Sequence, residues 1–505
     1  MASIEQLRPV PVEPAATFDS LDPSSGAVVA TFPVDDAHAV GEAVARAATA
    51  AVWWRSLGFD GRAVHLRRYK SEIARRIDEL ADLIHRENGK PHGDAVLEIT
   101  LVVDHLAWAA GHAKKVLGPH RVSSGLMAAN SAASVEYQPL GVIGVIGPWN
   151  YPVFTPIGSI AYSLAAGNAV VFKPSEYTPA IGRWLVEAWA RAVPDGPDVL
   201  GLVTGMGDTG AALCRSGVDK IAFTGSAATG RKVMGACAED LVPVLMECGG
   251  KDALLVDADA DLDAAADAAL WCGMSNGGQT CIGTERVYVA DAAYDRFVDL
   301  LTTKARDLAP GSGEGASWGP PTMPSQVDTI RRHVTDALAR GGRAVVGGES
   351  SVAVSGVGPT ILLDVPEDAE AVREETFGPT LTVTRVRDIE EGLALANASD
   401  YGLGGAVFTG SRRQGVELAR RMRSGMTSVN SIITFAMVPG LPFGGVGESG
   451  FGRIHGPDGL REFTRPKAVT SQRFALPVNL TSFGRPEKAT AMASKLMGIV
   501  HGRSR

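Results

Sequence analysis

The chain has 505 residues, and we expect two large domains, because a single hydrophobic core stops growing at about 250–300 residues. Apolar residues make up 45% and charged residues 21% of the chain, which is typical of a folded globular protein and excludes a disordered one. The net charge of −8 and the lack of a basic stripe exclude a protein that binds the nucleic-acid backbone through clustered Lys and Arg.

The chain start carries no secretory signal, because residues 1–7 lack a charged start followed by an apolar stretch. No apolar run is long enough to span a membrane. The number of cysteines is odd and their spacing fits no disulfide framework, which indicates a reducing, cytoplasmic location. The cysteines are Cys214, Cys237, Cys248, Cys272 and Cys281.

The first third of the chain is predicted to be helical. Apolar and charged positions alternate at helical spacing over residues 36–85, which predicts two amphipathic helices. A third helix is expected over about residues 94–116.

Short apolar runs then alternate with segments of helix length. Such alternation implies parallel strands with right-handed crossovers, and so a doubly wound α/β domain, our candidate dinucleotide-binding domain. The pattern starts again after Gly249-Gly250, so a second α/β domain follows. The strands of the first domain are expected at 141–146, 169–172, 200–203 and 220–223, those of the second at 252–256, 286–289, 344–346, 380–386 and 406–408, and surface loops at 311–321 and 347–358.

Two glycine-containing segments could hold a dinucleotide. Residues 205–210 (GMGDTG) match the G-x-G-x-x-G fingerprint after an apolar run, but a tight turn explains the same residues. Residues 223–226 (FTGS) close a strand and open a helix, whose free N–H groups can hold a diphosphate. Ser226 could equally be a simple helix N-cap.

Lys173-Pro174-Ser175-Glu176 follows a predicted strand, at the sheet edge where open α/β sheets bind ligands. Lys173 offers a cation to hydroxyl or phosphate groups. Glu176 can accept hydrogen bonds from both hydroxyls of an adenosine ribose, and it would repel the 2′-phosphate of NADP, which favours NAD. A solvated Lys/Glu pair is the alternative interpretation.

Three segments supply the groups that acyl-thioester chemistry needs. Cys281 could attack a carbonyl as a thiolate, and the Asn150 amide and the Cys281 backbone N–H could hold the resulting oxyanion. Glu247 could activate water, with its pKa raised by partial burial. Cys248 and Cys272 compete with Cys281 as nucleophile, although only Cys281 has a polar setting. The segments are residues 148–152 (PWNYP), 246–251 (MECGGK) and 277–281 (GGQTC).

Seven segments together resemble the aldehyde dehydrogenase superfamily, in one collinear order from about residue 20 to residue 470. The similarity implies a hydrolytic enzyme that oxidises an aldehyde to a carboxylic acid with NAD(P), through a covalent thiohemiacetal and a thioester. The segments are residues 148–152, 173–176, 223–226, 247–251, 278–281, 374–379 (EETFGP) and 442–445 (PFGG).

The resemblance implies a role for individual residues. Cys281 would be the nucleophile, Glu247 the general base and Asn150 the oxyanion donor. Lys173 and Glu176 would hold the adenosine ribose, and residues 205–210 would form only a strand-ending turn. The remaining cofactor contacts would come from Ser226 at the diphosphate, Glu375 and Phe377 at the nicotinamide ribose, and from Ile146, Gly147, Pro148, Trp149, Ser175, Gly205, Phe223, Thr224 and Gly225.

The family also implies the domain plan: two Rossmann-like α/β domains and a small β oligomerisation module, in a homodimer or homotetramer. The tail is weakly amphipathic and basic, so a membrane-surface helix, packing on the chain itself and disorder are all open. The expected ranges are 16–120 with 139–249 for the dinucleotide-binding domain, 250–455 for the catalytic domain, 121–138 with 466–481 for the module and 482–505 for the tail.

This chain departs from the family pattern at two places: Cys248 replaces a usual Leu, and residues 446–450 (VGESG) resemble the dimeric branch that acts on fatty and aromatic aldehydes. Residues 154–160 resemble other branches, so the branch and the oligomeric state stay open. Tyr151, Phe154, Ile282 and residues 432–437 would line a mostly apolar substrate funnel, which favours apolar aldehydes over semialdehydes. No metal site is expected.

Three rival functions fit parts of the pattern. They are a CoA-acylating enzyme, a non-catalytic protein with the same fold, and a cofactor-free hydrolase that uses Cys281, Glu247 and Lys251. Glu247 argues against CoA, and the nucleotide motifs would have no role in the hydrolase.

Overall fold

The structure, a computed structural model, describes residues 16–313, 315–353 and 356–502. The chain divides into two compact units. The larger unit comes from residues up to 116 and from 139–465, and the smaller one from 117–138 and from 466 onward. The domain boundaries predicted inside the larger unit remain predictions.

The chain enters the larger unit through the antiparallel hairpin β1 (Thr17–Leu21) and β2 (Val28–Pro33). Three helices follow where two were predicted, so that prediction was wrong. The helices break at Gly58 (φ +62°) and Arg76 (φ −119°), and at most one residue separates successive helices. The alternation of apolar and charged residues therefore continues across the breaks and does not reveal them. The helices are α1 (Ala37–Ser56), α2 (Gly58–Arg75) and α3 (Ile77–Asn88), and α4 (His92–Leu117) comes next.

The first sheet has the strand order β19-β9-β8-β5-β6-β7, with parallel pairing from β9 to β7. Strands β5 and β6 are buried along their whole length, which explains their uninterrupted apolar sequences. The elements are β5 (Val142–Ile146), α5 (Phe154–Ala166), β6 (Ala169–Lys173), α6 (Pro179–Ala192), β7 (Leu200–Leu202), α7 (Gly207–Cys214), β8 (Lys220–Thr224), α8 (Ala227–Ala238), β9 (Val244–Glu247) and β19 (Gly450–Phe451).

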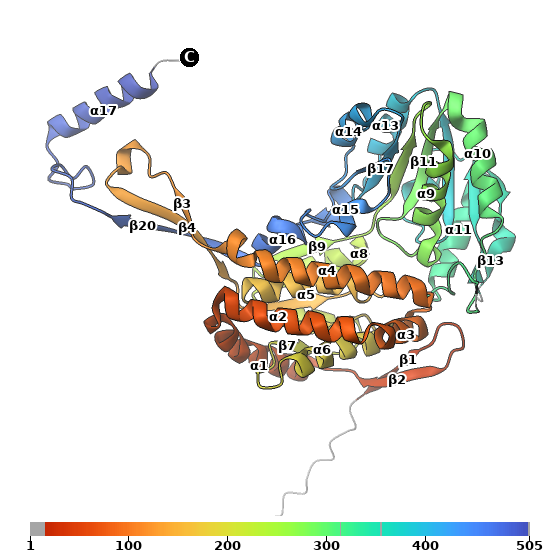
Figure 1. Cartoon of the computed structure of the whole chain (residues 1–505), viewed down its shortest axis with the longest axis horizontal. Coiled ribbons are helices and arrows are strands. Elements are labelled where there is room, and N and C mark those ends of the chain that lie inside the picture. Colours follow the sequence, from red (N-terminus) through yellow and green to blue (C-terminus); the bar gives the residue numbers. More distant parts are fainter. Residues whose placement is uncertain (1–15, 314, 354–355, 503–505) are drawn as a thin grey trace, which may run out of the picture. The chain divides into compact units, whose positions relative to one another are not determined.

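The second sheet has the order β12-β15-β16-β11-β10-β17-β18, parallel except for the edge strand β12. Figure 1 shows α9 and α10 along one side of it and α13 and α14 on the other. Its strands are β10 (Asp252–Val256), β11 (Thr284–Ala290), β12 (Arg343–Val346), β15 (Thr360–Leu363), β16 (Thr380–Val386), β17 (Gly405–Phe408) and β18 (Ser428–Val429). Its helices are α9 (Leu262–Met274), α10 (Asp291–Ala305), α11 (Gln326–Ala339), α12 (Glu370–Arg373), α13 (Ile389–Asn397), α14 (Arg412–Arg421), α15 (Thr434–Met437) and α16 (Gly456–Glu462).

Helices cover both faces of this second sheet, because successive strand residues pack into different cores. Leu254 and Val287 belong to the core under α9 and α10, whereas Leu255 and Tyr288 belong to the core under α13 and α14. The prediction of doubly wound α/β domains is therefore confirmed.

Segment 347–358 is not only a surface loop, as predicted. It contains the short hairpin β13 (Val352–Ala353) and β14 (Gly356–Val357), in which Val352 and Val357 are buried against Val327, Ile330 and Val334. The segment is rich in Gly and Ser, as surface loops are, so its composition gave no sign of the two buried valines.

The smaller unit contains a three-stranded sheet of order β20-β4-β3, in which β3 and β4 are antiparallel, and the helix α17 (Glu487–His501). The strands are β3 (His120–Val122), β4 (Ser131–Pro139) and β20 (Thr464–Gln472). Across the ranges that the structure describes, no helix combines the length and the apolar character needed to cross a bilayer.

Candidate active site

Asn150 lies in the turn between β5 and α5 and is held against the segment that leads to Cys281. Its side-chain amide donates to the Gln279 carbonyl at 2.9 Å, and its own carbonyl accepts from Asn276 Nδ2 at 3.0 Å and from Lys90 Nζ at 3.1 Å. The residue is only 5% exposed. The turn and the segment before Cys281 are thus one hydrogen-bonded assembly.

The chain reaches Cys281 through a tight left-handed turn. Asn276, Gly277 and Gly278 have φ values of +54°, +64° and +73°, and a Cβ on Gly278 would lie 2.1 Å from the Gly378 carbonyl oxygen. A side chain at position 278 is therefore excluded by both backbone conformation and space. Tyr151 Oη lies 3.0 Å from Thr280 Oγ1, which fixes the residue before the cysteine.

Cys281 alone among the five cysteines is partly exposed. Cys248 packs under α8, where a Cβ on Gly230 would meet its sulfur at 3.2 Å, and burial raises its pKa to about 12. Cys272 donates to the Ile282 carbonyl at 3.5 Å, and burial raises its pKa to about 11. Both buried thiols lack the access that a nucleophile needs.

Glu247 ends β9 and is 3% exposed. Burial raises its pKa to about 7, against the opposing effect of a 3.2 Å hydrogen bond from Thr224 Oγ1. Burial and then the charge of Glu247 also raise the pKa of Cys281 well above its usual value. The carboxylate and the thiol therefore act on each other electrostatically, and the thiol is protonated at neutral pH.

The segments that carry Glu247 and Cys281 approach each other closely at Gly250. A Cβ on Gly250 would lie 2.4 Å from the Cys281 carbonyl oxygen. Strand β19 pairs with β9 beside it, and Ser449 Oγ donates to the Gly249 carbonyl at 2.7 Å. These contacts bring three segments that are distant in sequence to one point.

Glu375 lies against the same glycines. Its carboxylate accepts from the Gly250 N–H at 3.0 Å, and burial raises its pKa to about 8. Phe377 has φ +52°, and its N–H donates to Glu285 Oε1 at 2.9 Å. Its ring lies perpendicular to that of Trp149, with centroids 5.5 Å apart.

A buried ion pair supports the loop that carries Glu375 and Phe377. This pair was not predicted from the sequence. Lys251 Nζ pairs with Glu285, whose carboxylate also accepts from the Thr376 N–H at 2.8 Å. Lys251 Nζ donates to Thr376 Oγ1 at 3.1 Å as well. The partners are 34 positions apart, and no spacing signal connects them.

Lys173 and the FTGS segment lie at the carboxyl ends of β6 and β8, the two strands that flank β5. Ile146 of β5 pairs with Lys173 of β6 and with Phe223 of β8. Lys173 is 4% exposed, and its ammonium donates to the Pro174 carbonyl at 3.1 Å. A buried ammonium with three donors and one neutral acceptor suits a ligand with hydroxyl or phosphate oxygens.

Several other predicted cofactor residues lie beside the carboxyl ends of these strands. The Gly147 N–H donates to the Lys173 carbonyl at 3.0 Å, and Ser175 Oγ lies 3.4 Å from Glu176 Oε2. Ser226 is the exposed N-cap of α8, accepting from the Thr229 N–H at 3.3 Å. A cap uses one lone pair and leaves the first N–H groups of the helix for an anion. The structure therefore shows the N-cap, and the role of Ser226 at a diphosphate, which is compatible with it, stays a prediction. These residues fit a dinucleotide.

Residues 205–210 form the turn from β7 into α7. A Cβ on Gly205 would lie 2.2 Å from Thr209 Oγ1, and that hydroxyl donates to the Asp35 carbonyl at 2.7 Å. The fingerprint glycine thus makes room for a structural hydrogen bond. Gly210 packs by the Lys173 side chain, since its Cβ would lie 3.7 Å from Lys173 Cδ.

Tyr151, Phe154 and Ile282, the residues predicted for the substrate funnel, all lie near Asn150 or Cys281 in sequence. Phe154 and Ile282 are buried, and Phe435 of the 432–437 segment is 7% exposed. Met437 is 51% exposed. The segment therefore runs from the interior to the surface.

The sequence profile of the aldehyde dehydrogenase family matches residues 11–469. A 4,4'-diapolycopene aldehyde oxidase from Methylomonas sp. is 36% identical over 464 residues, which cover 91% of this chain and 87% of the relative. A Mycobacterium ulcerans (strain Agy99) protein, provisionally assigned as an NADP(+)-dependent succinate-semialdehyde dehydrogenase, is 34% identical and covers 94% of this chain and 92% of its own length.

Among solved structures, PnpE from Pseudomonas sp. WBC-3, in complex with nicotinamide adenine dinucleotide, is 31% identical with a TM-score of 0.87. The match covers 92% of this chain and 96% of PnpE. The match to the family spans nearly the whole chain and includes both sheets and the segments around Cys281, Glu247 and Asn150. The chain belongs to the aldehyde dehydrogenase family and is an NAD(P)-dependent oxidoreductase.

Proposed function

We propose that the chain oxidises an apolar aldehyde to the carboxylic acid, with Cys281 as nucleophile, Asn150 as oxyanion donor and Glu247 as general base. The observation that carries this proposal is that the segments of the three groups are linked: the Asn150 amide donates to Gln279, two residues before Cys281, and Gly250, three residues after Glu247, packs against the Cys281 carbonyl. The Asn150 amide and the Glu247 carboxylate are each held by a hydrogen bond, which supports a preorganised site.

The first step is attack of the Cys281 sulfur on the aldehyde carbon, which gives a thiohemiacetal. The oxygen of this adduct is held by the Asn150 amide and the Cys281 backbone N–H. When bound, the nicotinamide would supply the hydride acceptor, and its positive ring would favour the Cys281 thiolate, which burial and Glu247 otherwise disfavour. The cofactor is thus expected to bind before the sulfur reacts.

The second step is hydrolysis of the thioester on Cys281. Glu247 removes a proton from the attacking water, and a pKa near 7 suits this task at neutral pH. The acid leaves and the sulfur is restored. Because Glu247 can activate water, it favours water over CoA as the acyl acceptor. A CoA-acylating enzyme would instead need CoA for turnover.

Lys173 and Glu176 are proposed to hold the adenosine ribose, Ser226 and the start of α8 the diphosphate, and Glu375 with Phe377 the nicotinamide ribose. Lys173 supports this assignment through its unused donors at the sheet edge. Glu176 would repel a 2′-phosphate, which favours NAD. The remaining proposed contacts come from Ile146, Gly147, Pro148, Trp149, Ser175, Gly205, Phe223, Thr224 and Gly225.

We also propose a cytoplasmic homo-oligomer. The sheet of the smaller unit has the edge strands β3 and β20, and every residue of β20 after Thr464 is exposed. Edge strands of this kind pair readily with another copy. All five cysteines are free, as a reducing compartment requires. Light scattering on the purified chain gives the number of copies.

A steady-state screen tests the function. NADH or NADPH formation is followed with benzaldehyde, decanal and succinate semialdehyde, each with and without CoA. We expect NADH with the two apolar aldehydes and no need for CoA. Cys281→Ala should remove turnover, whereas the matched control Cys237→Ala, a buried cysteine of α8, should keep it. Full turnover of Cys281→Ala would refute the mechanism.

A further inference from the structure

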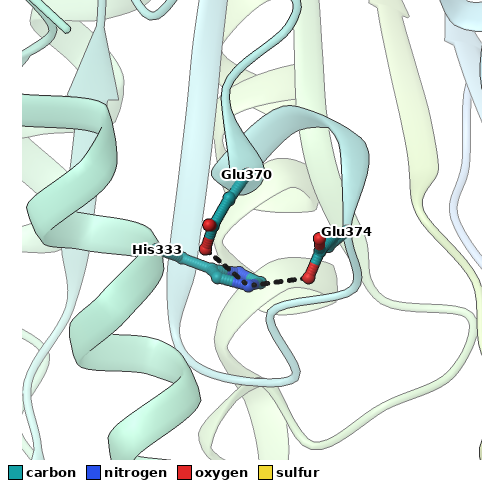
Figure 2. Close-up of side chains that lie close together, drawn as sticks. All are labelled: His333, Glu370 and Glu374. Carbon is teal, nitrogen blue, oxygen red and sulfur yellow. Dashed lines mark ion pairs between the residues drawn. The ribbon is translucent and has the colours of Figure 1, made fainter.

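Three potential metal ligands, none of which was assigned to the site described above, lie together beside α11. His333 lies on α11, Glu370 opens α12 and Glu374 follows its end. Figure 2 shows the three side chains pointing toward one another. His333 Nε2 lies 3.9 Å from Glu370 Oε2 and 3.5 Å from Glu374 Oε2.

The hydrogen bonds of His333 fix its tautomer. Arg332 Nη2 lies 3.2 Å from His333 Nε2, and a guanidinium can only donate, so Nε2 carries a lone pair. The proton is therefore on Nδ1, which lies 3.1 Å from Thr376 Oγ1. A neutral, fully buried imidazole directs its Nε2 lone pair toward two carboxylates and anchors its other nitrogen, as metal-binding histidines do.

The separations suit a metal centre. A zinc ion about 2.0–2.2 Å from each ligand atom places tetrahedral ligand atoms roughly 3.4 Å apart. The three ligand atoms lie within 4.8 Å of one another, and the Glu370 and Glu374 side chains, 38% and 57% exposed, have the freedom to close on an ion.

One positive charge already lies among these ligands. Arg332 Nε donates to Glu370 Oε2 at 2.7 Å, and Nη2 donates to Glu374 Oε2 at 3.3 Å. The Nε2 lone pair and the two carboxylates repel one another, so a cation between them lowers the electrostatic energy of the cluster. The Arg332 side chain is 56% exposed, so water screens its ion pairs and they hold the guanidinium only weakly. A doubly charged ion can therefore displace it.

We propose that His333, Glu370 and Glu374 form a site for a divalent metal ion of the zinc type, which binds in exchange for the Arg332 guanidinium. One imidazole and two carboxylates are ligands that zinc accepts, with a fourth position left for water. Glu374 and Thr376 flank Glu375, so the site adjoins the loop assigned to the nicotinamide ribose. The proposal does not rest on the function of that loop.

Binding of Zn²⁺ to the full-length chain by calorimetry, and of Co²⁺ by its visible absorption, tests the proposal. Both titrations use the Cys281→Ala variant, so that the partly exposed thiol cannot bind the metal. We expect one ion per chain, and a loss of affinity of at least roughly ten- to hundred-fold in Glu374→Gln. His333→Asn, which keeps a donor toward Thr376, should lose binding as well. The exposed Asp368→Asn serves as the matched control and should bind normally.

Arg332→Ala gives the decisive comparison. Because the guanidinium competes with the metal, its removal should tighten binding roughly ten-fold or more. Arg331→Ala, which removes a neighbouring charge paired with Asp328, should change little. Absence of binding in the Cys281→Ala chain, equal binding by Glu374→Gln, or unchanged or weaker binding by Arg332→Ala would each overturn the proposal.

Discussion

The buried ion pair between Lys90 and Glu98 supports the loop that carries Asn150. Lys90 Nζ donates to the Asn150 carbonyl at 3.1 Å, and Glu98 Oε1 accepts from the N–H groups of Val153 and Phe154 at 2.9 and 3.0 Å. The two side chains are 1% and 0% exposed. We predict that Glu98→Gln destabilises the protein and slows turnover together.

The size of the effect follows from burial. Glutamine keeps the volume and one acceptor oxygen, but it removes the carboxylate that pairs with the Lys90 ammonium. Breaking a buried pair in this way costs about 3–5 kcal/mol. The exposed pair Lys114–Asp60, at 2.7 Å with side chains 66% and 81% exposed, is a matched control whose loss costs about 0–1 kcal/mol.

Urea unfolding of Glu98→Gln, Asp60→Asn and the unmodified chain measures the difference. We expect the midpoint to fall clearly for Glu98→Gln and hardly for Asp60→Asn. In native buffer, kcat should fall for Glu98→Gln, because a displacement of Asn150 of about 1 Å is enough to impair catalysis. Equal midpoints for both variants would refute the assigned role of the buried pair.

Three further predictions concern the site itself. Glu247 must be ionised to act as a base, so with a pKa of about 7 acid release should rise with pH across that value, and Glu247→Gln should abolish this rise in pre-steady-state measurements. Gly250→Ala should lower the free energy of unfolding by about 1–3 kcal/mol and remove most activity, because its Cβ would lie 2.4 Å from the Cys281 carbonyl oxygen. The control Gly235→Ala, which has open space around it, should stabilise the chain slightly in thermal unfolding. Glu176→Gln should raise kcat/KM with NADP relative to NAD, and an unchanged ratio would exclude a role for this carboxylate in cofactor choice.

Most strands of the two sheets could be predicted from the sequence, because a buried strand is a local signal, although β9 and β15 were not among the predicted strands. The roles of the site residues stay predictions. Buried parallel strands such as β5 and β6 are apolar along their length, and the residues after them lie at the ligand-binding edge of the sheet. The polar Gly-Gly-Gln-Thr sequence that precedes Cys281 is likewise a local signal, and it distinguishes this cysteine from Cys248 and Cys272, which are buried.

The supporting contacts could not be predicted in the same way. In the sequence, Lys90 and Glu98 look like ordinary charged residues in or next to a helix. Lys251 directly precedes β10, and Glu285 lies on the neighbouring strand β11, 34 positions away. Their pairing is a consequence of tertiary packing, which leaves no periodicity. For the same reason the break at Gly58 and the buried face of the hairpin at 352–357 were missed.

The central claim is a covalent bond between the Cys281 sulfur and the aldehyde carbon. Rapid quenching of Glu247→Gln with NAD and benzaldehyde, followed by peptide mass spectrometry, tests it most directly. The account predicts a benzoyl adduct on the peptide that contains Cys281, formed together with one equivalent of NADH. NADH formation with that peptide unmodified, or with the adduct on Cys248 or Cys272, would contradict it.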